Sequence, residues 1–295
     1  MSGPADDVPV QTKAPGTLPS EERPSPSRTQ PALGAARRAL PGVLVLPAAA
    51  AAVFFALPLL ALVWRAPWPR LGQWLAAPAT VDALLLSLRC SVAAAAASFV
   101  FGLPLAAWLA SGASRLRTVV RVLVTLPMVL PPVVGGVAML LAYGRKGIVG
   151  AAADGWLGLV LPFTTEGVIV AETYVAMPFL VLTVEGGLRS LDPRFAAAAA
   201  TLGAGPWRSF RTVILPMLAP SLRAGLLVAW ARALGEFGAT ITFAGNLEGK
   251  TRTLPLAVYG ALETEPEAAI ALSLLLVAIS AAVLIALRRR WFPLR

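Results

Sequence analysis

The sequence predicts an all-α membrane protein, and three features of the 295-residue chain support that prediction. Its mean hydropathy is +0.75, which indicates that most of the chain lies in apolar surroundings. Charged residues make up only 14% of the sequence, whereas a soluble domain carries about 25%. Apolar runs of about 20 residues, long enough to cross a bilayer as a helix, also recur along the chain.

The apolar runs define six predicted membrane spans, each close to the length that a bilayer requires. An N-terminal segment, residues 1–38, precedes them and is rich in Pro, Ser, Thr and Ala with few large apolar side chains. Such a composition cannot bury a core, so we expect this tail to be disordered. The spans are Leu40–Trp64, Ala83–Ala110, Val122–Tyr143, Gly167–Leu188, Met217–Phe243 and Ala268–Leu287.

Lysine and arginine in the connecting segments predict the orientation, because cytoplasmic loops carry an excess of both. Sixteen of them lie in the tail, after the second and fourth spans and at the C-terminus, and six lie in the other loops. Both termini and residues 192–216 are therefore expected in the cytoplasm. We divide the chain into a disordered cytoplasmic tail over 1–38, a first span with its outer loop over 39–82, and a transmembrane domain over 83–290.

The composition argues against several classes of site. The chain has no His and a single Cys, so it lacks the usual zinc ligands, the base of a Ser-His-Asp triad and any internal disulfide. An enzyme embedded in the membrane would depend on Glu172 and Glu236 without a nucleophile–base pair. The net charge of +10 does not indicate nucleic acid, since the basic residues flank the spans. We expect no catalytic residue, no metal and no nucleic-acid partner.

Residues 192–216, between the fourth and fifth spans, predict two short helices joined by a turn. Asp192 suits an N-cap, Pro193 suits the first helical position, and Gly203 is a natural stop. A second helix follows and carries Arg208, and we expect Pro216 to end it before the next span. A loop with such defined ends favours a docking surface, while the alternative is a helix packed at the membrane interface.

Charged side chains inside the predicted spans are costly and usually face a bundle interior or a cavity. In the fifth span Arg232 and Glu236 are four residues apart, so they share a helix face. One interpretation is an ion pair that neutralises itself between helices, and the other places this face along the path of an anion. In the fourth span, Glu185 needs no special role near the cytoplasmic end, and Glu172 lies further inside.

The third span contains the prolines and glycines that a gate would need. Leu126-Pro127 and Pro131-Pro132 should kink or interrupt the helix, and Gly135-Gly136 permits close packing. The alternatives are an ordinary kinked span and a broken helix that rearranges between two states. The candidates for a translocation path or gate are Pro131, Pro132, Gly135, Arg232, Glu236 and Gly238.

The segment 197–216 resembles the cytoplasmic "EAA" loop of ABC-importer permeases, whose pattern is Glu-Ala-Ala, three residues, Gly, nine residues and Ile-x-Leu-Pro. Ala197-Ala198-Ala199 stands in the Glu-Ala-Ala position, Gly203 matches the glycine and Val213-Ile214-Leu215-Pro216 matches the end. Ala197 replaces the family's Glu, which removes a carboxylate from this loop, and Val213 replaces its Ile. The resemblance implies that residues 192–216 couple the permease to an ATPase.

A second stretch is similar to the permease subunits of molybdate importers. It runs from Ala231 to Asn246, ARALGEFGATITFAGN, and from Gly249 to Tyr259, GKTRTLPLAVY. Sulfate and thiosulfate permeases share the Gly-Glu-Phe/Tyr-Gly and Ala-Gly-Asn parts, so a sulfate or thiosulfate importer is the alternative. Tungstate is a close companion substrate, because its oxyanion nearly matches molybdate in size and charge.

These resemblances imply the six-helix architecture of type I ABC importer permeases and ATP-driven import of molybdate across the plasma (inner) membrane. The implied partners are a cytoplasmic ABC ATPase dimer, an extracytoplasmic oxyanion-binding protein, a second permease copy and membrane lipid. A passive channel would not need the docking loop. ATP and Mg²⁺ would bind the ATPase, because this chain has no G-x-x-x-x-G-K-[ST] loop and is expected to hold no cofactor. The implied coupling residues are Asp192, Ala197, Ala198, Ala199, Gly203, Arg208, Leu215 and Pro216.

Overall fold

The structure is a computed structural model that describes Gly3 and residues 42–291. The predicted disordered tail over 1–38, apart from Gly3, and the start of the first span at Leu40 lie outside the described residues. Every regular element in residues 42–291 is a helix. The chain forms two compact units, Met1–Leu57 and Pro58–Arg295, and each is described by itself.

The described part of the first unit is the first two thirds of a long apolar helix, α2 (Gly42–Trp64), which continues into the second unit. Its apolar run is 22 residues long, which is enough to cross a membrane. Every side chain from Val43 to Leu57 is exposed, so the helix presents an apolar surface on all sides. Such a helix suits a lipid environment and confirms the first predicted span.

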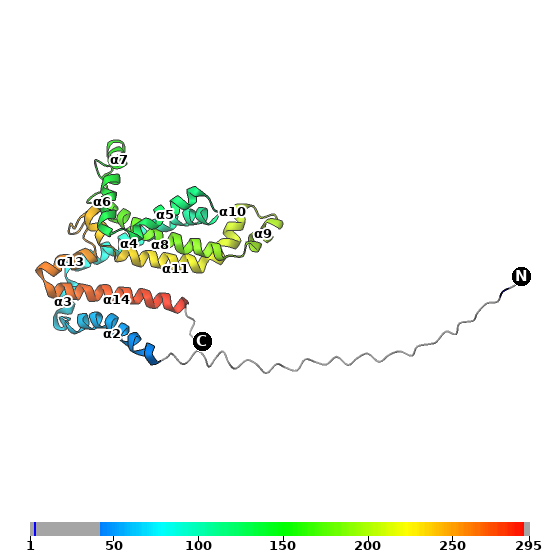
Figure 1. Ribbon diagram of the computed structural model, residues 1–295. Coiled ribbons are helices and arrows are strands. Elements are labelled where there is room, and N and C mark those ends of the chain that lie inside the picture. The colour runs from blue at the N-terminus through cyan, green and yellow to red at the C-terminus, as the bar shows by residue number, and fades with distance from the viewer. Residues whose placement is uncertain (1–2, 4–41, 292–295) are drawn as a thin grey trace. The chain divides into compact units, whose positions relative to one another are not determined.

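The second unit is built on three long helices that lie side by side: α4 (Pro78–Ala110), α8 (Thr165–Ser190) and α11 (Leu215–Leu234) (Figure 1). The other elements surround them. These are η1 (Trp68–Arg70), α3 (Leu71–Ala76), α5 (Arg115–Val129), α6 (Pro132–Tyr143), α7 (Gly150–Leu157), α9 (Pro193–Thr201), α10 (Pro206–Ser209), η2 (Phe210–Ile214), α12 (Gly238–Ala244), α13 (Leu254–Thr264) and α14 (Pro266–Trp291).

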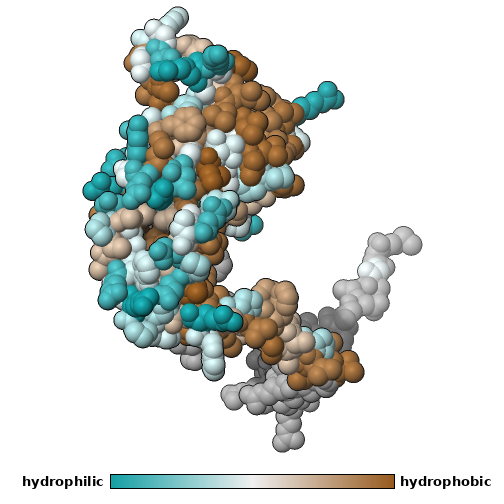
Figure 2. All heavy atoms as spheres, turned by 90° about the vertical axis from the view of Figure 1, so that its left-hand side faces the viewer, coloured by the Kyte–Doolittle hydropathy of each residue, from teal (hydrophilic) through white to brown (hydrophobic). Residues whose placement is uncertain are grey.

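Helix α8 is the centre of the core, because both α4 and α11 pack against it through glycines. A Cβ atom on Gly102 of α4 would lie 3.1 Å from a methyl group of Leu180, and one on Gly225 of α11 would lie 3.1 Å from Thr183. Small residues let helix backbones approach closely in a membrane, where no water drives the helices together. Figure 2 looks onto one end of this unit, where hydrophilic residues cluster and hydrophobic residues lie along their border.

Five helices in the described residues are long and apolar enough to span a membrane. Four of them confirm the predicted first, second, fourth and sixth spans, although α4 begins at Pro78 instead of Ala83. The fifth is a continuous helix from Pro206 to Leu234, which replaces the predicted Met217–Phe243. The remaining predicted span, the third along the chain, is divided between α5 and α6.

The third span is interrupted, as the prolines predict. Helix α5 ends at Val129, and Leu130 and Pro131 both have extended backbone angles, with ψ of 141° and 131°. A residue that precedes proline is driven away from the helical conformation, so the Pro131-Pro132 pair breaks the chain before α6 starts. Pro127, by contrast, remains inside α5.

The prediction that the fifth span is one helix was wrong. Helix α11 ends at Leu234, the backbone leaves the helix over Gly235–Phe237, and the short helix α12 begins at Gly238. The Glu236 side chain accepts a hydrogen bond from the Ala239 N–H at 2.8 Å and so satisfies one of the free donors at the start of α12. The carboxylate thereby stabilises the break.

The prediction that Pro216 ends the second short helix was also wrong. The helix runs without interruption from α10 through η2 into α11. In η2 the turns widen, and the Leu215 N–H donates to the carbonyl of Phe210, five residues earlier. Proline normally clashes with the carbonyl four residues before it. The wide turn just before Pro216 relieves that clash, so the helix continues.

Candidate coupling loop and transmembrane gate

The candidate coupling loop, residues 192–216, begins with the local structure that its sequence predicts. An Asp192 carboxylate oxygen accepts a hydrogen bond from the Arg194 N–H at 2.9 Å and caps α9, which has Pro193 at its first position. The helix stops before Gly203, whose φ of +79° lies in the left-handed region that favours glycine. The predicted N-cap, first turn and stop are therefore confirmed.

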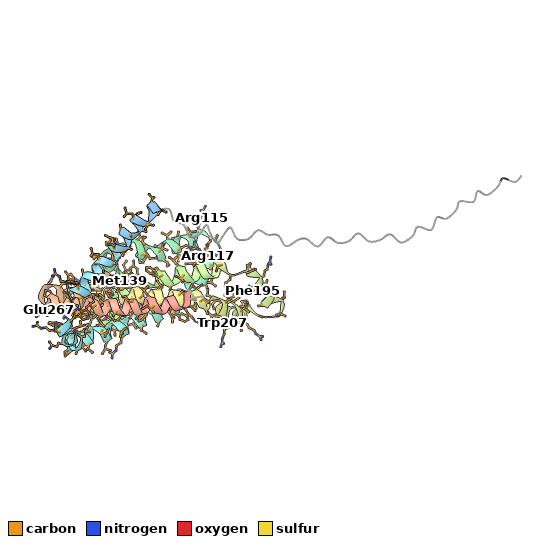
Figure 3. All side chains as sticks on the ribbon, turned by 90° about the horizontal axis from the view of Figure 1, so that it is seen from below. Arg115, Arg117, Met139, Phe195, Trp207 and Glu267 are labelled. Carbon is orange, nitrogen blue, oxygen red and sulfur yellow. The ribbon has the colours of Figure 1, made fainter. Side chains whose placement is uncertain are left out.

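Large apolar side chains of the coupling loop are exposed. Phe195 is 52%, Leu202 88% and Trp207 72% exposed, and the Trp207 ring stacks on Phe210 with centroids 6.0 Å apart. Figure 3 places Phe195 and Trp207 at the end of the bundle that carries α9 and α10. Aromatic residues are typical of protein interfaces. Our list of candidate residues missed Phe195, Leu202 and Trp207, although large apolar residues in an alanine-rich segment were a visible signal.

The predicted coupling residues divide into structural and surface positions. Ala197, in the position of the family's Glu, is exposed on α9 together with Ala198, whereas Ala199 is buried. Arg208 is exposed beside Trp207. The exposed alanine at 197 offers no charge to a partner. Leu215 is half-buried and Pro216 exposed at the start of α11.

The two broken spans meet at their breaks. A Cβ atom on Gly238, at the start of α12, would lie 2.6 Å from the Cβ of Pro132, at the start of α6. One on Gly136 would lie 2.5 Å from the Cβ of Thr242. The structure thus brings together Pro132 and Gly238, two gate candidates that are far apart in sequence. We call α6, the break Gly235–Phe237 and α12 the gate region.

The remaining gate candidates lie around this contact. Pro131 belongs to the break before α6, and Gly135 packs against α8, where an added Cβ would lie 3.2 Å from the Tyr174 ring. The predicted ion pair in the fifth span is present, with 2.6 Å between Arg232 and an oxygen of Glu236. The Glu236 side chain is 1% and the Arg232 side chain 30% exposed. Because Glu236 also caps α12, the pair joins the end of α11 to the gate region.

Glu172 is not a member of that ion pair. It is 1% exposed, and its Oε2 has no hydrogen-bond partner among the described residues. A buried carboxyl oxygen without a partner is unusual in a folded protein. No group of three His, Cys, Asp or Glu side chains in the described residues could hold a metal ion.

The structure corrects our interpretation of Glu185, which gave this residue no special role. Its buried carboxylate accepts hydrogen bonds from Arg121 of α5 at 2.6 and 3.0 Å and pairs with Arg189 at 2.9 Å. Arg121 also donates to the Leu109 carbonyl at the end of α4. This charge cluster holds α4, α5 and α8 together.

Solved structures share this fold. A bacterial ABC transporter involved in the import of the acidic polysaccharide alginate matches with a TM-score of 0.65 and 18% identity, over 84% of this chain and 93% of that one. The MetNI methionine ABC transporter matches with a TM-score of 0.55 and 20% identity, over 71% and 93% of the two chains. At these identities the likeness concerns the fold, which is that of the type I ABC importer permeases.

Curated relatives are similar over nearly their full length. The molybdenum transport system permease protein ModB of Mycobacterium tuberculosis is 44% identical over 251 residues, which are 85% of this chain and 95% of that protein. ModB of Escherichia coli K12 is 38% identical over 215 residues, 71% and 92% of the two chains. Residues 102–291 match the family model described as binding-protein-dependent transport system inner membrane component. The chain therefore belongs to the family of inner membrane components of binding-protein-dependent transport systems.

Proposed function

We propose that this chain is the permease subunit of an ATP-driven importer that carries molybdate across the plasma (inner) membrane. The observation that carries the proposal is the 44% identity over 251 residues to a relative named as a molybdenum transport permease. The run from Ala231 to Asn246, which resembles molybdate permeases, forms the end of α11, the break Gly235–Phe237 and α12. Sulfate or thiosulfate remains the alternative substrate, and tungstate is a companion.

The coupling loop is the surface that we assign to the ATPase. Its exposed Phe195, Leu202 and Trp207 suit a surface that a partner covers. The excess of Lys and Arg supports a cytoplasmic location for this surface and for both termini. ATP and Mg²⁺ would bind to a dimer of that partner, and this chain would hold no cofactor. An oxyanion-binding protein outside the membrane and a second copy of the permease complete the proposed importer.

A continuous helix offers a mechanical link from the coupling loop to the gate region. The helix from Pro206 to Leu234 has 29 residues, which corresponds to a length of about 43 Å at 1.5 Å per residue. Its start carries the exposed Trp207, and its end adjoins the Arg232–Glu236 ion pair. Movement of α9 and α10 on ATP binding would tilt this helix and separate α12 from α6, as alternating access requires.

Uptake of radiolabelled molybdate tests the proposal directly. The chain is reconstituted in proteoliposomes with its ATPase and binding protein, and sulfate and tungstate are added in excess as competitors. We expect ATP-dependent uptake that tungstate blocks and sulfate does not. Block by sulfate would assign the chain to the sulfate group, and uptake without ATP would indicate a passive channel.

Replacing Gly203 by valine should uncouple ATP hydrolysis from uptake. The residue has φ of +79°, and a β-branched side chain in this region costs about 1–2 kcal/mol, so the end of α9 should rearrange. We expect uptake to fall about tenfold while the permease still folds. Gly205→Ala is the matched control, because Gly205 has φ of −64° and open space around it. Normal uptake by Gly203→Val would contradict the coupling role of this turn.

A further inference from the structure

An almost entirely apolar groove lies on the surface of the second unit, between α4 and α11. Its volume is about 480 Å³, within the range of about 300–1,000 Å³ that small-molecule sites occupy. Its lining combines two alanines of α4 with the aromatic rings of Phe99 and Trp230. The lining residues are Val92, Ala95, Ala96, Phe99, Val100, Leu226, Leu227 and Trp230.

The groove is held in shape by the helices themselves. The Trp230 Nε1–H donates a hydrogen bond to the Ser91 Oγ at 3.0 Å, which fixes the indole ring of α11 against α4. Ser91 is fully buried, so this hydrogen bond is shielded from solvent. The wall that Trp230 forms is therefore ordered before any ligand enters.

Arg223 lies at one end of this groove. It precedes Leu226 by three residues and Leu227 by four on α11, so it occupies the same helix face one turn away. Its side chain is exposed, and none of the ion pairs among the described residues involves it. A guanidinium at the edge of an apolar groove is suited to bind a phosphate.

The contacts between α11 and α8 show the level of Arg223 along the length of the bundle. A Cβ atom on Gly187 would lie 2.6 Å from the Cβ of Ser221, and one on Gly225 would lie 3.1 Å from Thr183. Arg223 is therefore level with the segment of α8 that contains Glu185 and its two arginine partners. That layer is the cytoplasmic end of the spans in the proposed orientation, where lipid phosphates lie.

We propose that this groove binds an acyl chain of an anionic phospholipid of the cytoplasmic leaflet, with Arg223 at its phosphate. This proposal rests on the proposed function in one respect only: the orientation of the permease in the membrane decides which leaflet supplies the lipid. The acyl chain lies in the apolar groove, and the Arg223 guanidinium pairs with the negative charge of the headgroup. A second copy of the permease fits this face poorly, because a two-fold contact centred on this groove would place two Arg223 guanidinium groups opposite each other.

Quenching of Trp230 fluorescence by brominated lipids tests the proposal. The full-length chain and its Trp230→Phe variant are placed in phosphatidylcholine vesicles that contain brominated phosphatidylglycerol or, separately, brominated phosphatidylcholine. The difference between the two proteins reports Trp230 alone. We expect brominated phosphatidylglycerol to reach half-maximal quenching at a mole fraction about fivefold lower than brominated phosphatidylcholine does. A factor of this size corresponds to one basic residue near the membrane surface.

Variants of arginine separate the proposed site from general attraction to an anionic surface. Arg223→Gln should abolish the fivefold preference, whereas Arg115→Gln, which changes an exposed arginine of α5, should keep it. Excess inorganic phosphate should leave the preference unchanged. Equal quenching by both lipids, a preference that survives Arg223→Gln, or a preference that free phosphate removes would each overturn the proposal.

Two further measurements cover the other outcomes. If Trp230→Phe fails to assemble, native mass spectrometry of wild type and Arg223→Gln counts the retained phosphatidylglycerol, and equal retention would contradict the proposal. Disulfide formation between Ala96→Cys chains in a Cys90→Ser background, without quenching by either lipid, would assign the groove to a second copy. None of these assays contains molybdate or ATP, so their failure would leave the proposed transport function untouched.

Discussion

Alanine in place of Gly238 is expected to reduce transport by about tenfold or more. The added Cβ would lie 2.6 Å from the Cβ of Pro132 and 3.5 Å from the Val133 nitrogen, and neither can swing away as a flexible side chain could. Overpacking of this kind costs about 1–3 kcal/mol. That cost falls on the state in which α6 touches α12, so the equilibrium between the states of the gate region should shift. Uptake and ATPase rates of the reconstituted importer measure the effect.

Gly235→Ala is the matched control, because Gly235 lies in the same break and its added Cβ would meet only the Ala231 carbonyl at 3.6 Å. It should transport nearly as well as wild type. Pro132→Gly removes the opposing atom, and in combination with Gly238→Ala it should restore part of the lost uptake. Wild-type uptake by Gly238→Ala alone would mean that α6 and α12 do not remain in contact during the cycle.

The features that sequence predicted well are those in which neighbouring residues decide the backbone. Asp192-Pro193 starts α9 and Gly203 stops it because capping and left-handed φ are local properties. The break before α6 follows in the same way from Pro131-Pro132. Composition alone was enough for the first, second, fourth and sixth membrane spans, since 22 apolar residues such as those of α2 have few other possible environments.

The features that sequence missed depend on contacts or on unusual turns. Apart from Arg232, the end of α11 is apolar through Leu234, and the hydrogen bond from the Ala239 N–H to Glu236 that stabilises the break depends on the fold. Pro216 is a normal helix breaker, and the wide turn of η2 that accommodates it has no clear sequence signal. Arg121 and Glu185 are 64 residues apart, so their pairing required the packing of α5 against α8.

The candidate site was predicted in its parts and not in its arrangement. Both interrupted spans supplied gate candidates, but nothing in the sequence placed Pro132 beside Gly238. The spacing of Arg232 and Glu236 did predict their ion pair, because four residues complete about one helical turn. Their role in transport stays a prediction, since an ion pair between helices can serve stability alone.

Arg232→Met is expected to destabilise the permease by about 3–5 kcal/mol, because it leaves the carboxylate of Glu236 buried without a counter-ion. Glu236→Gln should cost less, since the amide oxygen can still accept the Ala239 N–H and the partly exposed Arg232 can reach a polar surrounding. Unfolding temperatures in detergent measure both changes. The double variant Arg232→Met/Glu236→Gln should recover most of the stability, and failure to recover would show that the two side chains are not coupled.

The same double variant separates the two interpretations of this ion pair. If the pair only neutralises itself between helices, stability and molybdate uptake should return together. If Arg232 also attracts an anion along the path, stability should return while uptake stays low, because methionine cannot donate a hydrogen bond to an oxyanion. Arg232→Lys with Glu236 intact then keeps the charge near the path, and we expect it to transport better than the double variant. If Arg232→Lys and the double variant both transport as well as wild type, Arg232 does not lie on the translocation path.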